Sequence, residues 1–162
     1  MQRIVIIGNS GSGKSTLAKA LADRHGLAHL DLDTIAWAPS APPTRRCLAE
    51  SAAAIADFQA QHLGWIMEGC YADLAELALV HATQLVFLNP GVEVCVANCR
   101  ARPWEPHKYS SPAAQDRNLA MLIAWVRGYA TRDDELSLRR HRTLFDGFSG
   151  DKVEHAQLPP LA

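Results

Sequence analysis

The sequence lacks any long hydrophobic run. Its 162 residues contain no stretch of the roughly 20 apolar residues that a membrane-spanning helix needs. The first residues, Met1 to Gly8, also lack the basic, apolar and cleavage-site order of a signal peptide. We therefore expect a protein that resides in the cytoplasm and has no membrane partner.

An excess of charge of either sign is also missing. The formal net charge is −1, and no basic stripe with interleaved aromatic residues occurs along the chain. This argues against nucleic acid as a partner, because binding to polyanions depends on clustered positive charge. The length fits one domain spanning residues 1–162. A monomer and a homodimer are both compatible with it.

Cysteine is scarce, and its spacing completes no metal site. Of the four cysteines, Cys95 and Cys99 would share one face of a helix, but no Cys-x-x-Cys pair or nearby histidine extends them. Disulfides are rare in the cytoplasm. We expect all four to be small apolar side chains in or near the core.

Short apolar runs alternate along the chain with amphipathic stretches. The expected strands are Arg3–Ile7, Ala28–Leu32, Gly64–Glu68, Gln84–Leu88 and Lys152–Leu158. The expected helices are Lys14–Arg24, Thr44–His62 with Thr44 as cap, Ala72–Val80, Val92–Arg102, Asp116–Thr131 and Asp134–Phe145, with loops at Trp37–Pro43 and Arg102–Pro112. This alternation predicts an α/β fold whose mostly parallel sheet carries helices on both faces. Ligands of such sheets bind at the carboxyl ends of the strands.

A phosphate-binding motif follows the first expected strand. Gly8-Asn9-Ser10-Gly11-Ser12-Gly13-Lys14-Ser15 matches G-x-x-x-x-G-K-[ST], and a helix is expected directly after it. Backbone N–H groups of such a loop converge on phosphates, Lys14 reaches the β- and γ-phosphates, and the Ser15 hydroxyl ligates Mg²⁺. Thr16 is expected at the α-phosphate. The motif predicts a nucleoside triphosphate with Mg²⁺, and the absence of an Asn-Lys-x-Asp run favours ATP over GTP.

Two aspartates end the second expected strand. Alternation along a strand would place Asp31 and Asp33 on the same side, facing the phosphate loop. Phosphoryl transfer needs charge neutralisation and an oriented nucleophile. We assign Asp31 to the metal shell, and Asp33 to catalysis and to the acceptor hydroxyl. The alternative is that Asp33, with Thr34, caps the following turn.

The end of the third expected strand supplies further candidates for contact with the acceptor. Glu68 either orients water or Mg²⁺ or makes a hydrogen bond to backbone or substrate, and the pattern favours neither role. Gly69 allows a ligand to approach the backbone closely, and Tyr71 is expected to line the acceptor pocket.

Basic residues are frequent in the second half of the chain. Arginines that close over a triphosphate assist phosphoryl transfer. Arg100 is the leading candidate for catalysis and nucleotide binding, followed by Arg102 for the nucleotide, then Lys108, and by Arg117 for the substrate. Arg100, Arg102 and Lys108 lie in or beside the proline-rich segment RPWEPHKY, and Arg117 lies at the start of the helix expected after it.

The phosphate loop near the N-terminus, the Asp-x-Asp pair and the segment WIMEGCY resemble the small-metabolite and nucleoside monophosphate kinases, including shikimate and gluconate kinases. The opening IVIIGNSGSGKSTLA and the HLD segment are most similar to bacterial topology-modulation-like P-loop ATPases. This resemblance implies a P-loop NTPase three-layer α/β/α sandwich. It also implies a five-stranded parallel sheet in the order 2-3-1-4-5 and an adenylate-kinase-like helical lid over residues 100–132.

The same resemblance implies an acceptor-binding helical segment at residues 37–63. Arg45 and Arg46 lie nearest to the place where shikimate kinases carry a substrate-binding arginine, so both are candidate substrate residues. Where those kinases have a glycine triplet after the third strand, this chain has Gly69-Cys70-Tyr71.

These features predict a kinase that transfers the γ-phosphate of Mg-ATP to a small hydroxyl or phosphate acceptor. The alternative is a regulatory ATPase that binds nucleotide and acts through a protein partner. A kinase needs Asp33 and the Thr44–Arg46 region to form a pocket beside the γ-phosphate. A regulatory ATPase needs only the phosphate loop and a water-positioning acid such as Glu68.

Overall fold

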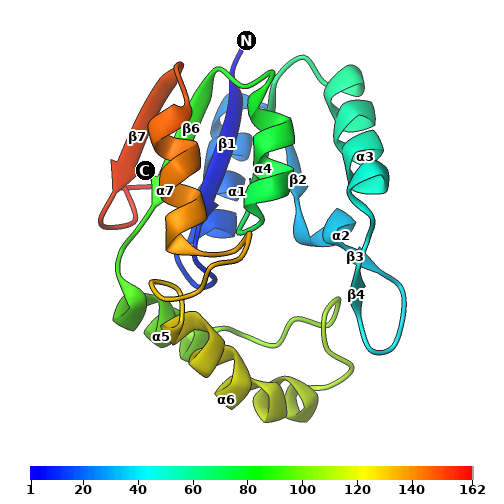
Figure 1. Ribbon diagram of the computed structural model, residues 1–162, viewed down its shortest axis with the longest axis vertical. Helices are drawn as coiled ribbons and strands as arrows, with labels where there is room; N and C mark the ends of the chain where they lie inside the picture. The colour runs from blue at the N-terminus through cyan, green and yellow to red at the C-terminus, as the bar shows by residue number, and fades with distance from the viewer. Residues whose placement is uncertain (162) are drawn as a thin grey trace.

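A five-stranded parallel sheet forms the centre of the protein, whose computed structural model describes residues 1–161 (Figure 1). Its strands are β1 (Arg3–Gly8), β2 (Ala28–Asp31), β5 (Trp65–Gly69), β6 (Gln84–Leu88) and β7 (Asp151–His155). They lie in the order β2-β5-β1-β6-β7 with every pair parallel. When these five strands are numbered 1 to 5 along the chain, their order in the sheet is 2-3-1-4-5, as predicted. The predicted α/β fold is therefore confirmed.

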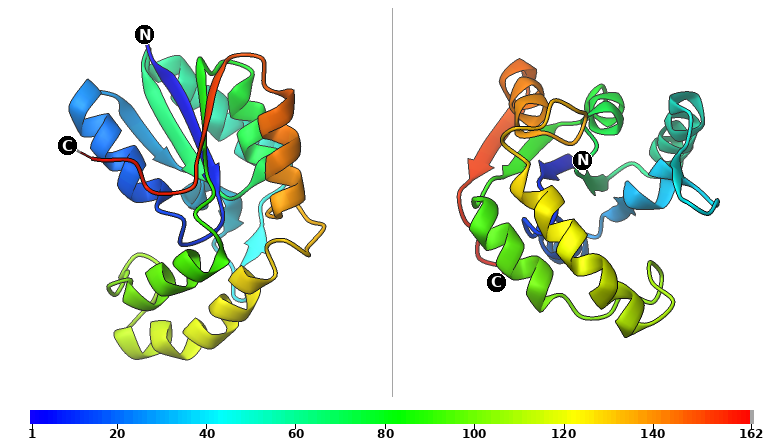
Figure 2. Two further views of the ribbon diagram at one scale, coloured as in Figure 1. Left: turned by 90° about the vertical axis from the view of Figure 1, so that its left-hand side faces the viewer. Right: turned by 60° about the horizontal axis from the view of Figure 1, so that its bottom comes forward.

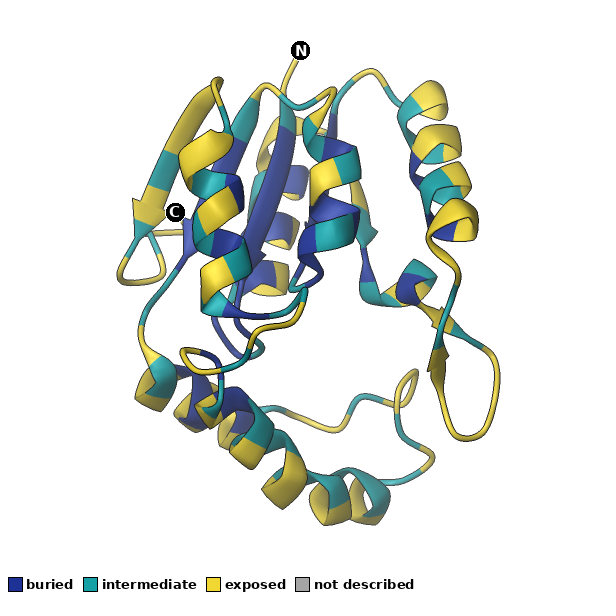
Figure 3. Ribbon diagram, viewed as in Figure 1, coloured by how far each residue is buried: buried dark blue, intermediate teal, exposed yellow. Residues whose placement is uncertain are grey.

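Alternate side chains of the central strand pack into two separate core clusters. Ile4 and Ile6 face α1 (Lys14–His25), whereas Val5 and Ile7 face α4 (Ala72–Leu79) and α7 (Leu138–Gly147). Figure 3 shows the sheet centre as the most deeply buried part of the molecule. Burial on both faces explains why the strands read as continuous apolar runs in the sequence.

Two helices project beyond the carboxyl ends of the strands. α5 (Val92–Ala101) and α6 (Pro112–Arg127) pack on each other around Cys95, Val96, Cys99 and Val126, and Figure 2 shows the pair set apart from the sheet layers. We call these helices and the loop between them the α5–α6 unit. Among residues 1–161, no helix combines the length and the apolar character needed to cross a lipid bilayer.

The segment after β2 differs from the prediction. Instead of a loop followed by a helix from Thr44, a short helix α2 (Asp33–Ala36) leads into an antiparallel hairpin of β3 (Trp37–Ala38) and β4 (Thr44–Arg45). Thr44 pairs with Ala38 and caps nothing. α3 (Leu48–Gln61) therefore begins four residues later than predicted.

Two later helices are also shifted from their predicted starts. α6 begins at Pro112 rather than Asp116, because the Ser111 hydroxyl accepts a hydrogen bond from the N–H of Ala114 and proline suits the first helical position. α7 begins at Leu138 rather than Asp134, and Ser137 is its cap. In both cases a capping serine determines the start.

Candidate active site

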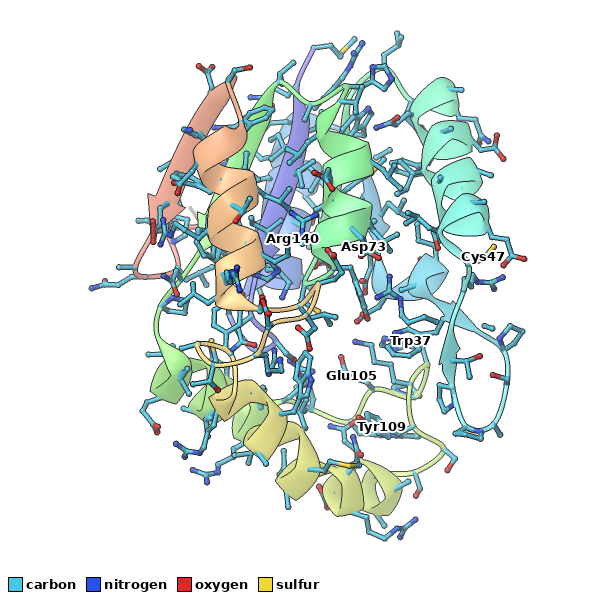
Figure 4. The ribbon with its side chains drawn as sticks, viewed as in Figure 1. Trp37, Cys47, Asp73, Glu105, Tyr109 and Arg140 are labelled. Atoms are coloured by element: carbon cyan, nitrogen blue, oxygen red, sulfur yellow. The ribbon has the colours of Figure 1, made fainter. Side chains whose placement is uncertain are left out.

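A cleft of about 840 Å³ opens at the carboxyl ends of β1, β2 and β5. The phosphate loop forms its floor, the hairpin forms one wall, and the α5–α6 unit forms the opposite wall. Figure 4 shows Trp37 on the hairpin side, with Glu105 and Tyr109 on the side of the α5–α6 unit. A cleft of this volume suits a small-molecule ligand.

Glycines determine the shape of the phosphate loop. Gly11 has a φ of +80°, and a Cβ there would lie 2.4 Å from the carbonyl oxygen of Cys95. The side chain of Asn98 donates a hydrogen bond to the carbonyl of the same glycine at 2.8 Å. Gly13, in the left-handed region, is the N-cap of α1. The loop is thereby packed tightly against α5, and its N–H groups lie at the positive end of the α1 dipole.

Lys14 is folded back onto its own loop. Its ammonium donates to the carbonyl oxygen of Asn9 at 2.8 Å, and the residue is only 8% exposed. The loop thus holds a buried positive charge at the floor of the cleft. Such a charge, next to a helix N-terminus, fits the phosphates of a nucleotide.

Glu68, at the end of β5, is joined to the first turn of α1. It lies beside Asp31 in the parallel register and accepts a hydrogen bond from the Ser15 hydroxyl at 2.8 Å. His29, on β2, places its Nε2 atom 3.4 Å from the same carboxylate oxygen. With 2% exposure, Glu68 is almost completely buried.

The oxygen atoms of Ser15, Asp31 and Glu68 fit a hard divalent cation such as Mg²⁺. Burial, followed by the nearby carboxylates of Glu68 and Asp33, raises the pKa of Asp31 to about 6. A cation would relieve this repulsion between carboxylates. Within residues 1–161, no group of three or more His, Cys, Asp or Glu side chains is placed to hold a metal by itself.

Asp33 reaches the cleft through a turn rather than through strand alternation. The carboxylate of Asp31 accepts the N–H of Asp33 at 2.9 Å, and α2 begins there, so β2 ends before Asp33. Both carboxylates nevertheless line the cleft. Asp33 is thus the first residue of α2 and also lines the cleft.

Two donors hold the carboxylate of Asp33. The hydroxyl of Tyr71 donates to Oδ1, and the ammonium of Lys108 lies 3.0 Å from Oδ2. Burial alone would raise the pKa of Asp33, but the charge of Lys108 and these two hydrogen bonds outweigh it and lower the pKa below its usual value. Asp33 is therefore a carboxylate at neutral pH.

Aromatic side chains form the wall around this carboxylate. The indole of Trp37 donates to the Tyr71 hydroxyl at 2.8 Å. Burial raises the pKa of Tyr71 far above its usual range, so the hydroxyl keeps its proton and can donate to Asp33. The guanidinium of Arg45 lies 4.8 Å from the centre of the Tyr71 ring and pairs with Asp73 at 2.9 Å. Asp73 lies behind this wall, at the start of α4 (Figure 4).

The structure brings most of the sequence-derived candidates into one cleft. They are Ser10, Gly11, Gly13, Lys14, Ser15, Thr16, Asp31, Asp33, Arg45, Glu68, Gly69, Tyr71, Arg102 and Lys108. Gly8, Asn9 and Ser12 belong to the loop but are buried behind its ligand-facing surface. Arg46, Arg100 and Arg117 lie outside the cleft lining.

The position of Arg100 has a geometric reason. Asn98 and Arg102 line the cleft from α5 and its end, and they are four residues apart, so they lie on the same side of the helix. Arg100 falls between them, on the opposite side, and is exposed. Arg117 is likewise exposed, and Arg46 pairs with Glu50 at 3.9 Å.

Several residues of the cleft were not selected from the sequence. Trp37, Cys70, Asn98, Glu105, Tyr109, Leu122, Trp125, Leu136 and Leu158 all line it. Helical spacing from Cys95 could have identified Asn98. Trp37 was assigned to a loop, and no sequence pattern places Leu158 beside Gly13, where it packs.

The sheet order, the glycine-shaped loop and the buried lysine define a P-loop α/β protein. The chain belongs to the AAA domain family, whose pattern matches residues 4–109. A search of curated protein sequences gives no match.

Solved structures share the fold. A shikimate kinase from Bacteroides thetaiotaomicron is 18% identical, with a TM-score of 0.53 and coverage of 98% of this chain and 89% of that one. A sugar kinase from Janibacter sp. HTCC2649 is 19% identical, with a TM-score of 0.50 and coverage of 98% and 88%. A gluconokinase from Sinorhizobium meliloti 1021 is 19% identical, with a TM-score of 0.50 and coverage of 99% and 85%. The predicted shikimate- and gluconate-kinase layout is thus confirmed as a fold.

Proposed function

We propose that this protein is an ATP-dependent phosphotransferase that moves the γ-phosphate of Mg-ATP to a small-molecule hydroxyl. The observation that carries the proposal is the carboxylate of Asp33. It shares one cleft with Lys14, is held ionised, and is oriented by Tyr71 and Lys108. A hydroxyl acceptor needs an oriented, ionised carboxylate beside the phosphate loop, whereas simple hydrolysis needs only one water-positioning acid, which Glu68 could supply.

The donor side is the phosphate loop. Its N–H groups and Lys14 would hold the triphosphate, and Arg102 would approach it from the end of α5. Ser15 and Asp31 would hold Mg²⁺, which neutralises charge on the phosphates when bound, and Glu68 would orient the Ser15 hydroxyl from outside the metal shell. ATP is preferred over GTP in this proposal because the chain has no guanine-reading motif.

The acceptor side is the wall formed by the hairpin, which lies in the proposed acceptor-binding segment 37–63, together with Gly69 at the end of β5 and Tyr71 after it. The acceptor hydroxyl would donate to Oδ2 of Asp33 beside the ammonium of Lys108, which stays paired, and would give its proton to that carboxylate. Its oxygen would form a bond to the γ-phosphorus, the bond to the bridging oxygen would break, and ADP would leave. The Tyr71 hydroxyl would keep Oδ1 occupied and so fix which oxygen takes the proton.

Charge pairing favours a hydroxyl acceptor over a phosphorylated one. Outside the phosphate loop, the cations of the cleft are already paired: Arg45 with Asp73, Arg102 with Glu105 at 3.6 Å, and Lys108 with Asp33. A phosphate monoester would bring about two negative charges to a wall without a spare cation. A regulatory ATPase would have no use for this oriented carboxylate, so we do not favour it.

Residues 100–132, from the end of α5 through α6 and the turn after it, would act as a lid. The loop of the unit already reaches across the cleft, since Lys108 contacts Asp33 and Glu105. Closure would exclude water, which otherwise competes with the acceptor.

A metabolite panel scored for ADP release tests the proposal. We expect neutral hydroxyl compounds to include one that raises ADP release well above the rate with ATP alone, while phosphorylated compounds do not. Asp33→Asn should abolish the stimulation and leave nucleotide affinity largely intact. Lys14→Ala is the donor-side comparison, and it should remove ATP-dependent thermal stabilisation. No stimulation by any acceptor, with hydrolysis unaffected by Asp33→Asn, would favour the regulatory ATPase.

A further inference from the structure

Asn9 joins the phosphate loop to the far helix of the α5–α6 unit. It is 2% exposed, and its Nδ2 donates to the carbonyl oxygen of Val126 at 3.2 Å, although 117 residues separate the two in sequence. Val126 lies in the last turn of α6 and is fully buried. This hydrogen bond therefore ties the loop directly to the C-terminal end of the helix.

The other polar atoms of Asn9 are used within the loop itself. Its Oδ1 accepts the N–H of Ser10 at 2.8 Å, and its backbone oxygen accepts the ammonium of Lys14 at 2.8 Å and the N–H of Ser12 at 3.2 Å. The ammonium of Lys14 and the N–H of Ser10 are groups that a phosphate would recruit. Binding of a polyphosphate thus competes for two of the bonds that hold Asn9 in place.

The end of α6 is held by its packing on α5 and by a set of hydrogen bonds. The carbonyl of Trp125 accepts from Arg132 and from the N–H of Gly128, and that of Val126 accepts from Asn9 and from the N–H groups of Gly128 and Tyr129. Among these partners, Asn9 is the one that belongs to the phosphate loop. Carbonyls at a helix C-terminus need such partners. A movement of the Asn9 amide therefore changes a contact at the end of α6. The side chains of Leu122 and Trp125 on this helix line the cleft.

We propose that Asn9 is a positioning residue that couples occupancy of the phosphate loop to the position of the α5–α6 unit. When phosphates take Lys14 and the N–H of Ser10, the Asn9 side chain is released from its present geometry. The hydrogen bond from Asn9 to the carbonyl of Val126 then changes, and the α5–α6 unit moves relative to the sheet. This coupling rests on the proposed nucleotide site but does not depend on the acceptor or on transfer.

The test measures the distance between the α5–α6 unit and the sheet layers by double electron–electron resonance spectroscopy. Nitroxide labels are attached at Met121→Cys on α6 and Val80→Cys at the end of α4, both strongly exposed, in a Cys47→Ser background. The exposure of Cys47 departs from the expectation that all four cysteines lie in or near the core, and the remaining cysteines are buried or half-buried. The ligands are Mg-ADP and inorganic tripolyphosphate, which occupies the loop without a base.

We expect both ligands to shift the distance distribution in the parent protein, and the shift to be lost in Asn9→Ala at saturating ligand. Asn9→Ser is the second variant, because its hydroxyl can still accept from Ser10 but is too short to reach Val126. Asn98→Ala is the matched comparison. It also removes a hydrogen bond from an asparagine side chain, here between α5 and the phosphate loop. That bond involves neither Lys14 nor Ser10, so the shift in distance should persist.

An unchanged shift in both Asn9 variants would overturn the coupling, and so would the absence of a shift in the parent with ligand bound. Calorimetry on the same samples separates these results from a failure of the nucleotide site. If the parent binds neither ligand, the proposed function is wrong. If it binds and the unit does not move, only the coupling is wrong.

Discussion

The hydroxyl of Ser15 donates a hydrogen bond to Oε1 of Glu68 at 2.8 Å, which joins the first turn of α1 to the end of β5. A hydroxyl that donates its proton in this way turns its lone pairs outward. The bond thus orients the oxygen of Ser15 toward the place where a cation would meet the phosphates. It also gives the buried carboxylate of Glu68 a partner, as burial of a charge requires.

Glu68→Gln should weaken binding of Mg-ATP by about 10- to 100-fold, the usual effect of losing an outer-shell carboxylate. The amide keeps the size of the side chain and an acceptor for Ser15, but it removes the negative charge. Binding of ATP in the presence of a chelator should change little. Calorimetry with and without Mg²⁺ makes the comparison, and equal losses under the two conditions would rule out a metal role.

Tyr71→Phe should shift the acid limb of the pH profile of the transfer rate toward higher pH. The hydroxyl of Tyr71 is one of the donors that lower the pKa of Asp33, and a hydrogen bond to a charged group contributes about 1.5–3 kcal/mol. Its loss should therefore raise that pKa. The KM for ATP should stay unchanged.

Trp37→Phe is the matched control for Tyr71→Phe. It removes the donor to the Tyr71 hydroxyl but leaves the bond from Tyr71 to Asp33. Its acid limb should therefore move much less. Equal movement in the two variants would mean that the aromatic wall, and not the hydroxyl, sets the pKa of Asp33.

Arg102→Ala should weaken ATP binding several-fold, whereas Arg100→Ala should have no effect. Only the first of these arginines lines the cleft, and the second is exposed on the opposite side of α5. Each substitution removes one positive charge, and the two positions are close together. The long-range electrostatic contribution to ATP binding should therefore change equally in both variants. ATP titration monitored by thermal stabilisation measures both, and a larger loss in Arg100→Ala would contradict the placement.

The phosphate loop could be predicted from sequence because it is contiguous. Its glycines, its lysine and the helix after it fall within a few residues, so a local pattern contains nearly all of the geometry. The strand order followed from the family resemblance and is confirmed. By contrast, Asp33 reached the predicted cleft for a different reason: the turn made by the side chain of Asp31 replaced strand alternation.

Contacts between distant segments could not be predicted in this way. Lys108 meets Asp33 across 75 residues, and the Arg45–Asp73 pair crosses 28. Each depends on how the hairpin and the α5–α6 unit are placed, which no local pattern encodes. Arg100 ranks above Lys108 in the sequence because arginines are expected to close over the triphosphate, whereas helical phase places Arg100 on the outer face of α5.

Asp31→Asn should stabilise the ligand-free protein at pH 7.5. The folded pKa of Asp31 is raised from 3.8 to about 6, so the folded state holds its proton more tightly than the unfolded state. Its stabilising contribution is complete below pH 3.8 and is lost as the pH rises through 6. The variant avoids this loss, and its advantage should shrink as the pH falls toward 4. Denaturant unfolding across this range measures it, and a constant advantage would contradict the raised pKa.

His141 should produce the opposite pH dependence. It is fully buried, its Nε2 donates to the carbonyl of Cys70 at 2.7 Å, and its Nδ1 accepts from the hydroxyl of Tyr129 at 2.6 Å. Burial, with the nearby charges of Lys14 and Arg132, lowers its pKa from 6.5 to about 4. The neutral ring therefore stabilises the fold above pH 6.5, and this contribution is lost as the pH falls to 4.

The expected loss over that range is roughly 3 kcal/mol, from about 1.4 kcal/mol for each pH unit between the two pKa values. His141→Gln does not titrate, so the free energy of unfolding of the parent should exceed that of the variant most at pH 7 and least near pH 4.5. Nitrogen NMR of the imidazole gives an independent reading, because the ring should stay neutral at pH 5. A protonated ring at that pH, or a difference in unfolding free energy that does not change with pH, would show that His141 does not hold Cys70 and Tyr129 together as a neutral bridge.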